Sequence, residues 1–252
     1  MLTCRLLGPY YSLESVVNTG LGNQLFLYAV TRSIAEDKGY NFFINPDAWQ
    51  GHDLFDVDLG INDGDIKHVF NDNYEQIFNP DIFKVEDFTL LNGYFQSEKY
   101  FNHGKVRKWF VPRERSENLF SYDDYCFVHY RAGDYSIPPW DALQLPMSYY
   151  RDAKERMLGI NKDLRFVIVT NCSRECKKLF PEDTVISGTV EDDFVLLMHA
   201  KYLIISNSSF SWWVAWLNPN NTVIGPLGWY NYNRNRSIFS PADIKVERFI
   251  WT

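Results

Sequence analysis

The sequence predicts an α/β protein, and three features of the chain lead to that prediction. In the second half, short apolar segments alternate with segments of helical periodicity, the pattern of parallel strands covered by helices. Polar clusters follow directly after two of the apolar segments. In the first half, a turn with two glycines opens a long helix.

The second half predicts a sheet of parallel strands. Short apolar segments rich in β-branched or aromatic residues indicate buried strands at 125–130, 165–170, 184–187, 202–206 and 222–225. The intervening periodicity predicts helices at 147–158, 173–180, 190–200 and 208–217. This alternation predicts a Rossmann-like half from about residue 120 to about residue 250.

The first half is less regular. A strand expected at 3–7 leads to a turn at 20–24, and a helix expected at 25–38 ends at Gly39. The segment 41–108 gives mixed signals. The polar stretch 112–118 is a candidate linker, so we expect one domain at 1–118 and a second at 119–252.

Composition narrows the class of protein. The 252-residue chain carries a net charge of −7 without a block of Lys and Arg, which argues against nucleic-acid binding. No apolar run approaches the roughly 18 residues of a membrane span. The first residues lack the pattern of a signal peptide, so we expect a cytoplasmic protein. Four scattered cysteines fit free thiols better than a zinc site.

The first polar cluster, His129–Tyr135, follows an apolar strand and contains His129, Arg131 and Asp134. Ligands of open α/β sheets bind beyond the carboxyl ends of strands. The planar guanidinium of Arg131 suits a phosphate, because it donates two parallel hydrogen bonds to anionic oxygens. A surface turn with an Arg131–Asp134 ion pair is the alternative.

Two further clusters open helices. Gly20–Gln24 lets the backbone approach a ligand closely, and the amides of Asn23 and Gln24 suit sugar hydroxyls; a plain tight turn is the alternative. In Ser206–Trp213, the hydroxyl residues at a helix N-terminus either cap the helix or cradle an anion. Most of the bulk of Trp212, Trp213 and Trp216 is expected in the core or in packing between domains.

These segments resemble the α-1,2-fucosyltransferases of glycosyltransferase family 11. The family's GGLGNQ-(L/M)-F-x-YA start is matched at 20–29, its HxRRGDY segment at 129–135 and its NSSFSWWAAWLN segment at 207–218. A fourth match, GYFQSEKYF, lies at 93–101. The order and spacing also fit, so the resemblance covers most of the chain.

The resemblance implies a glycosyltransferase B-type fold, in which two Rossmann-like domains face a central cleft. Residues 1–118 would form the acceptor side and residues 119–252 the nucleotide-sugar side. It implies inverting transfer of L-fucose from GDP-L-fucose to a glycan hydroxyl, through an α-1,2 linkage, with no metal or other cofactor. The implied partners are a nucleotide sugar and a glycan acceptor.

The resemblance also assigns the site. Arg131 would hold the diphosphate, while His129 and Asp134 would line the reacting centre. The residues implied on the donor are Gly22, Asn23, Asn171, Asn207, Ser208, Ser209 and Phe210. Asp134 is the first candidate for the general base and His129 the second. The alternative role of Asp134 is only to orient Arg131.

The chain departs from the family at two positions of the site. Ala132 stands in place of the family's second arginine, and Asn171 stands where related enzymes use a carboxylate to bind guanine. These departures leave open a different donor, either another GDP-6-deoxyhexose or a UDP-sugar. They also leave open a non-catalytic homologue that binds glycans or nucleotides. Formal DxD pairs at 56–58 and 63–65 would fit a metal-dependent transferase instead.

Overall fold

The computed structural model describes residues 1–6, 19–72, 77–113, 122–131, 133–136, 140–229 and 243–252, with the backbone alone for residues 134, 136, 140 and 142. Its contacts divide the chain into two compact units. The first is Met1–Arg113 with Pro241–Lys245, and the second is Glu114–Ser240 with Val246–Thr252. The predicted boundary at 118/119 lies outside the described residues and stays a prediction. No described helix is long and apolar enough to cross a membrane.

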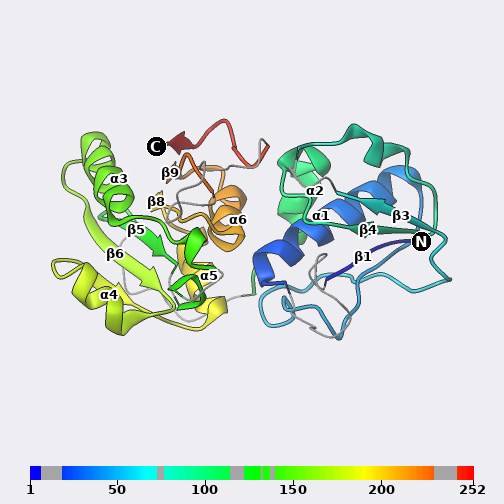
Figure 1. The fold of residues 1–252 in the computed structure, drawn as a ribbon, viewed down its shortest axis with the longest axis horizontal. Helices are drawn as coiled ribbons and strands as arrows, with labels where there is room; N and C mark the ends of the chain where they lie inside the picture. Colours follow the sequence, from blue (N-terminus) through cyan, green and yellow to red (C-terminus); the bar gives the residue numbers. More distant parts are fainter. Residues whose placement is uncertain (7–18, 73–76, 114–121, 132, 137–139, 230–242) are drawn as a thin grey trace. The chain divides into compact units, whose positions relative to one another are not determined.

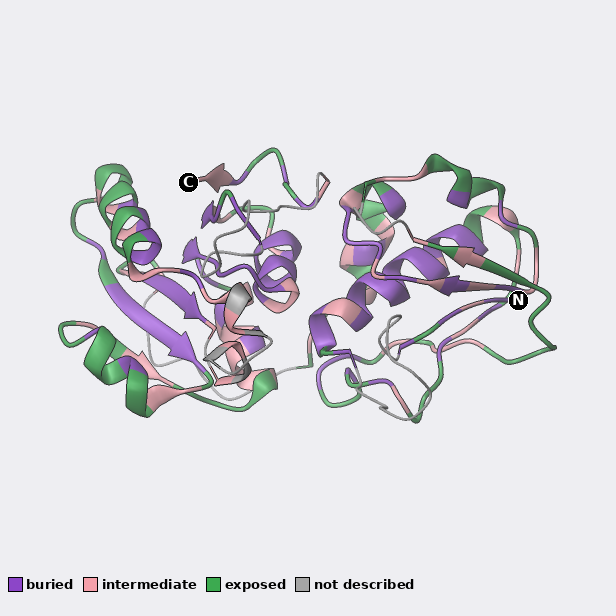
Figure 2. Ribbon diagram, viewed as in Figure 1, coloured by how far each residue is buried: buried purple, intermediate pink, exposed green. Residues whose placement is uncertain are grey.

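The first unit is built on a four-stranded parallel sheet with strand order β2-β1-β4-β3 (Figure 1). Its elements are β1 (Leu2–Cys4), α1 (Leu21–Lys38), β2 (Phe42–Phe43), β3 (His68–Asn71), β4 (Thr89–Asn92) and α2 (His103–Trp109), with short 3₁₀ helices at Pro80–Lys84 and Glu98–Tyr100. Helix α1 is buried over most of its length (Figure 2). It ends, as predicted, at Gly39, whose φ of 68° is left-handed.

The first unit differs in detail from the prediction. Helix α1 begins at Leu21, because the carbonyl of Gly20 already accepts the amides of Asn23 at 2.9 Å and Gln24 at 3.3 Å. Gly22 and Asn23 therefore lie in the first turn of the helix and not before it. The strand expected at 3–7 is Leu2–Cys4. Strands of two to four residues are too short to leave a clear alternation in the segment 41–108.

The second unit contains every strand and helix predicted for it, with ends that agree within two residues. Its elements are β5 (Tyr125–Tyr130), α3 (Met147–Ile160), β6 (Arg165–Thr170), α4 (Ser173–Leu179), β7 (Thr184–Ile186), α5 (Val190–Met198), β8 (Tyr202–Ile204), α6 (Ser209–Leu217), β9 (Thr222–Gly225) and β10 (Ile250–Trp251), with short 3₁₀ helices at Gly133–Ser136 and Trp140–Leu143. Strand β10 was not predicted.

The second sheet is parallel, with strand order β10-β9-β8-β5-β6-β7 (Figure 1). The chain runs from β5 outward to β7 and then returns to β8 on the other side of β5. This is the strand order of the Rossmann fold. The chain adds β6 and β7 on one side of β5 and β8 to β10 on the other, so the order of strands reverses between β5 and β8. There Val128 pairs with Ile204.

Most of the buried residues of the second unit are apolar. The sheet strands β5 and β6 and helix α6 are buried, while α3 and α4 expose their outer faces (Figure 2). Trp212, Trp213 and Trp216 are fully buried, as predicted. The prediction of an α/β fold made of two units with parallel sheets is confirmed, while the central cleft between them stays a prediction.

Candidate functional site

The carboxyl ends of β5 and β8 bring together polar groups from two distant parts of the chain. His129 is the last residue but one of β5 and is only 6% exposed. Its Nδ1 lies 2.9 Å from the hydroxyl of Ser206, which follows β8. Arg131 comes directly after β5. An imidazole, a hydroxyl and a guanidinium thus lie at the point where the strand order reverses, the usual ligand site of such sheets.

His129 is held neutral by its surroundings. Burial, and then the positive charge of Arg131, lower the pKa of the imidazole to about 3. Its ring packs against Phe210, with 5.4 Å between the ring centroids, and Phe210 packs in turn against Phe194. A group with so low a pKa is a weak proton acceptor near neutral pH, which counts against His129 as the general base.

Arg131 is half-buried, and its guanidinium carbon lies 5.4 Å from the ring centroid of Tyr135. Between them, Gly133 adopts a left-handed φ of 65°. The left-handed conformation favours glycine. A Cβ at Gly133 would lie 2.9 Å from the side-chain amide nitrogen of Asn171, so the two positions are close neighbours. The side chain of Asp134 lies outside the described residues, and its role stays a prediction.

Asn171 follows β6, the other neighbour of β5, and its side chain is exposed. The approach to Gly133 puts it beside the segment that carries Arg131. The strand ends therefore bring together His129, Arg131 and Asn171, which the sequence had named as site residues. Contact of Asn171 with a nucleotide base stays a prediction.

The N-terminus of α6 contains the hydroxyl cluster. Ser208 is the N-cap residue, but its hydroxyl makes no capping hydrogen bond, and Ser209 is the first residue of the helix. The hydroxyl of Ser211 instead donates to the backbone carbonyls of Ser206 and Ser208, at 3.0 Å each. Of the two predicted roles for Ser208, side-chain capping is wrong, and anion binding stays a prediction.

Asn207 braces the loop that precedes α6. It is 2% exposed, and its side-chain amide donates to the carbonyls of Leu143 and Trp229, at 2.6 Å each. Both amide hydrogens are used in this way, so only the carbonyl oxygen of the side chain is left to contact a nucleotide-sugar. The position explains why an asparagine suits this loop.

In the first unit, Asn23 contacts a residue that the sequence analysis did not name as part of the site. Its side-chain oxygen accepts a hydrogen bond of 2.7 Å from Gln96. This bond joins the segment 20–29 to the segment 93–101, which the family resemblance had already marked. Gln96 is 5% exposed, and within the described residues its own buried carbonyl oxygen has no hydrogen-bond partner. Gly22 is buried in the first turn of α1.

Carboxylates elsewhere in the first unit make local contacts. Asp58 accepts a hydrogen bond of 2.8 Å from the amide of Gly60, and Asp63 accepts one of 2.6 Å from Asn41. Across the described part of the chain, no three His, Cys, Asp or Glu side chains are grouped as a metal site would require.

Comparison with known families identifies the chain. The sequence model of glycosyl transferase family 11 matches residues 66–246, a range that contains β5, β8 and the polar groups at their ends. The chain belongs to glycosyl transferase family 11. The predicted family is therefore confirmed.

Relatives of this family-11 chain transfer sugars through α-1,2 linkages, as their names state. It is 32% identical to an α-1,2-colitosyltransferase of Escherichia coli over 178 residues, which are 62% of the chain and 61% of that protein. It is 25% identical to galactoside α-(1,2)-fucosyltransferase 1 of Rattus norvegicus over 241 residues, which are 80% of the chain and 62% of that protein. The chain thus spans about three fifths of the length of these relatives.

Solved structures of heptosyltransferases are also similar. E. coli heptosyltransferase WaaC with ADP aligns over 100% of this chain and 92% of that one, with a TM-score of 0.46 and 10% identity. E. coli ADP-heptose lps heptosyltransferase II aligns over 51% of this chain and 38% of that one, with a TM-score of 0.35 and 12% identity.

Proposed function

We propose that this chain is an inverting, metal-independent glycosyltransferase that moves L-fucose from GDP-L-fucose to a glycan hydroxyl and forms an α-1,2 linkage. Membership of family 11 and the α-1,2-transferases among its relatives support the proposal. The observation that carries it is that β5, which Arg131 directly follows, pairs with β8, which leads to α6, so that His129 lies 2.9 Å from Ser206 where the strand order reverses.

The positive charge of Arg131 at the carboxyl edge of the second sheet suits the departure of a nucleoside diphosphate. Breaking the sugar–phosphate bond builds positive character on the sugar and negative charge on the leaving diphosphate. The guanidinium of Arg131 would receive that charge through paired hydrogen bonds, and the backbone amides that open α6 would add to it. Fixed donors of this kind need no reorganisation during the reaction, which is the source of their effect on rate.

Inversion requires the acceptor hydroxyl to attack from the face opposite the leaving diphosphate. A base that takes the hydroxyl proton speeds this step. Asp134 is the candidate for that base, since the low pKa of His129 makes it a poor proton acceptor. His129 would then act on a hydroxyl by hydrogen bonding alone.

A second candidate function keeps the chemistry and changes the sugar. The E. coli relative with 32% identity is named for colitose transfer, and Asn171 replaces the carboxylate that related enzymes use on guanine. Another GDP-6-deoxyhexose, or a UDP-sugar, would then be the donor. Competition of unlabelled nucleotide sugars against GDP-fucose separates these candidates.

Calorimetric titration of the chain with GDP and with UDP, each with and without EDTA, tests the donor. We expect GDP to bind more tightly than UDP and EDTA to leave both affinities unchanged. Preference for UDP would overturn the assigned donor. Loss of GDP affinity in EDTA would overturn metal independence.

Hydrolysis of GDP-fucose without an acceptor tests whether the chain is an enzyme. Slow release of fucose, abolished in Arg131→Ala, is the expected result. Tight nucleotide binding with neither hydrolysis nor transfer to a panel of galactose-terminated glycans would instead identify a non-catalytic binding protein. The control is Ser33→Ala, which changes a buried residue of the first unit. It shows how much activity is lost when a substitution affects folding alone.

A further inference from the structure

Three buried side chains form a hydrogen-bonded chain at the reversal of strand order. They are His129 at the end of β5, Ser206 after β8, and Ser211 in α6, and both serines are completely buried. The Nδ1 of His129 lies 2.9 Å from Ser206 Oγ, and Ser206 Oγ lies 3.3 Å from Ser211 Oγ. The number of available protons decides which way each bond points.

At its Ser211 end, this series of hydrogen bonds reaches backbone carbonyl groups, which can only accept a hydrogen bond. Ser211 Oγ lies 3.0 Å from the carbonyl oxygens of both Ser206 and Ser208. A carbonyl has no proton to give, so the single hydroxyl proton of Ser211 points to these two oxygens. The lone pairs of Ser211 Oγ are then available to the hydroxyl of Ser206.

The direction of donation at Ser211 also sets the direction of the hydrogen bond between Ser206 and the imidazole of His129. When Ser206 donates to Ser211, its oxygen accepts from Nδ1 of His129, and every contact in the chain carries a proton. In the opposite arrangement Ser206 donates to Nδ1, and the two hydroxyl oxygens would lie 3.3 Å apart with no proton between them. Buried polar groups favour the arrangement that pairs them all.

The geometry points to Ser206 and Ser211 as positioning residues that hold His129 in the tautomer protonated at Nδ1, so that Nε2 offers a lone pair to a hydroxyl of the sugar substrate. The part that concerns substrate rests on the proposed function. Phe210, with its ring 5.4 Å from the imidazole, fixes the plane of the ring. A site that accepts a hydrogen bond from a hydroxyl also selects against sugars that lack it.

The charge state of His129 agrees with this role. The imidazole is buried, and among the described residues Arg131 is the charged group that acts on it. Burial and this charge lower the pKa of His129 to about 3. His129 therefore stays neutral near pH 7, and neutral imidazole has one donor and one acceptor nitrogen. The two serines decide which nitrogen is which.

Nitrogen-15 NMR of histidine-labelled protein measures the tautomer directly and needs no turnover. The chain has five histidines, and the His129→Gln variant identifies the signals of interest. We expect a protonated Nδ1 and an unprotonated Nε2 from about pH 8 down to about pH 5. A proton on Nε2 in the unaltered protein would overturn the proposal.

Two variants test the serines. In Ser211→Ala, the hydroxyl of Ser206 loses its acceptor and turns to donate to Nδ1, so the proton of His129 should move to Nε2. In Ser206→Ala, the two tautomers should coexist. Unchanged histidine signals in both variants would overturn the role of the serines. Ser33→Ala removes a buried hydroxyl that accepts from Asn102 in the first unit, and it should leave the signals of His129 unchanged.

Kinetics then separate this inference from the proposed function. Ser206→Ala should lower kcat for transfer roughly tenfold and leave the Kd of GDP unchanged, because one hydrogen bond to substrate is misdirected. A normal kcat would overturn the substrate part of the inference. The expected tautomer in a protein that transfers no sugar would uphold the role of the serines and overturn the proposed function.

Discussion

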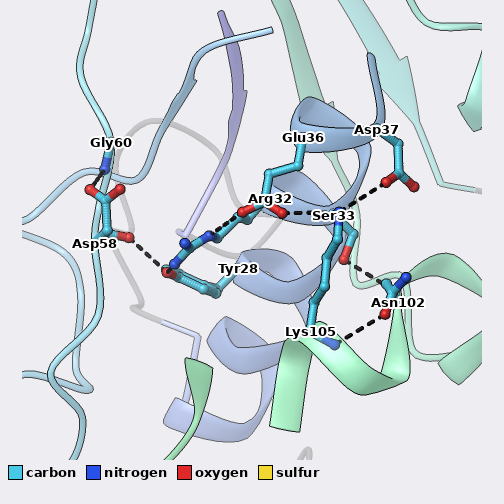
Figure 3. Close-up of polar contacts among 9 residues, drawn as sticks. All are labelled: Tyr28, Arg32, Ser33, Glu36, Asp37, Asp58, Gly60, Asn102 and Lys105. Atoms are coloured by element: carbon cyan, nitrogen blue, oxygen red, sulfur yellow. Dashed lines mark hydrogen bonds and ion pairs between the residues drawn. The ribbon is translucent and has the colours of Figure 1, made fainter. Parts of the chain in front are cut away.

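Helix α1 of the first unit and the carboxyl edge of the second sheet use polar side chains in opposite ways. On α1, Arg32 donates to Glu36 at 2.9 Å and to the hydroxyl of Tyr28 at 2.8 Å, and Tyr28 donates to the carbonyl of Asp58 at 2.7 Å (Figure 3). Lys105, from α2, lies 3.1 Å from Glu36. Charged groups here neutralise one another and join α1 to α2 and to the loop at Asp58.

At the carboxyl edge of the second sheet, the buried hydrogen bonds that join His129, Ser206 and Ser211 are neutral. His129 and the serines are paired without an ion pair, and Arg131 supplies the positive charge beside them. Two arginines near aromatic rings thus have different surroundings. Arg32 is joined to a carboxylate of its own helix. Arg131 directly follows a strand whose last residue but one is a neutral, buried imidazole. We therefore expect Arg32 to act on stability and Arg131 on the reaction.

The largest effect is expected from Arg131→Ala. Loss of a fixed positive group at the leaving diphosphate should lower kcat roughly 10²–10³-fold, with little change in Tm. Rates of transfer from GDP-fucose and a thermal melt measure the two quantities. Arg131→Lys, which keeps the charge but lacks the planar fork, should recover part of the rate. Near-normal turnover of Arg131→Ala would contradict the role of Arg131 in binding the leaving diphosphate.

The matching change in the first unit is Arg32→Ala. It removes the hydrogen bonds to Glu36 and Tyr28 and a guanidinium carbon 4.3 Å from the ring centroid of Trp109. We expect a loss of about 1–2 kcal/mol in the free energy of unfolding, measured with urea. GDP affinity should not change. If Arg32→Ala weakened GDP binding more than it weakened the fold, the contrast between the two arginines would fail.

A smaller change concerns the nucleotide. Asn171→Asp adds a carboxylate at the exposed end of β6, and a charged acceptor binds the guanine edge more strongly than an amide oxygen does. GDP should bind roughly tenfold more tightly by calorimetry, while UDP should not. Asn220→Asp places the same charge in an exposed turn of the same unit and is the control. An unchanged affinity for GDP would mean that Asn171 does not face the base.

The smallest effect compares two acidic side chains. Burial acts to raise the pKa of Glu36, but hydrogen bonds from Arg32 and Lys105 outweigh it, so that pKa lies below its usual value. Asp193, in the first turn of α5, has its pKa raised to about 6, first by burial and then by Asp192, although the amide of Gly188 donates to it. Ionised Asp193 therefore opposes folding.

Asp193→Asn should stabilise the protein at neutral pH. Because the folded pKa lies above the unfolded value of 3.8, the folded state binds the extra proton between these values. The variant should gain on the order of 1 kcal/mol at pH 7, after allowance for partial exposure. The gain should shrink as pH falls through 6 and vanish below about 4, as urea unfolding at several pH values would measure. A gain that ignored pH, or an equal gain in Asp192→Asn, would contradict this explanation.

How much could be predicted from sequence differed between the two units. In the second unit the strands of β5 and β6 are six residues long and buried, and their apolar runs gave their bounds. In the first unit β2 has two residues and β3 is an exposed edge strand, so neither left a usable pattern. The start of α1 was placed four residues late, because Gly20 carries no side chain to signal a cap.

The candidate site was predictable where its residues are adjacent in sequence. His129 lies near the end of β5 and Arg131 directly after it. The strand order then brings Asn171 and Ser206 to the same edge. The sequence analysis did not predict the contact of Gln96 with Asn23, because a glutamine in an irregular segment follows no periodic pattern. Its family segment, 93–101, was the one available signal.

The sequence by itself determined the family, the parallel strands of the second unit and the tryptophan core, since burial repeats along the chain and motifs are local. Only the tertiary structure decided that His129 meets Ser206 across 77 residues, that Asn207 braces a loop, and that Asn23 contacts Gln96. A hydrogen bond between distant residues leaves no mark in the pattern of either segment. Its partners, and the direction of its proton, are fixed only when the strands pair.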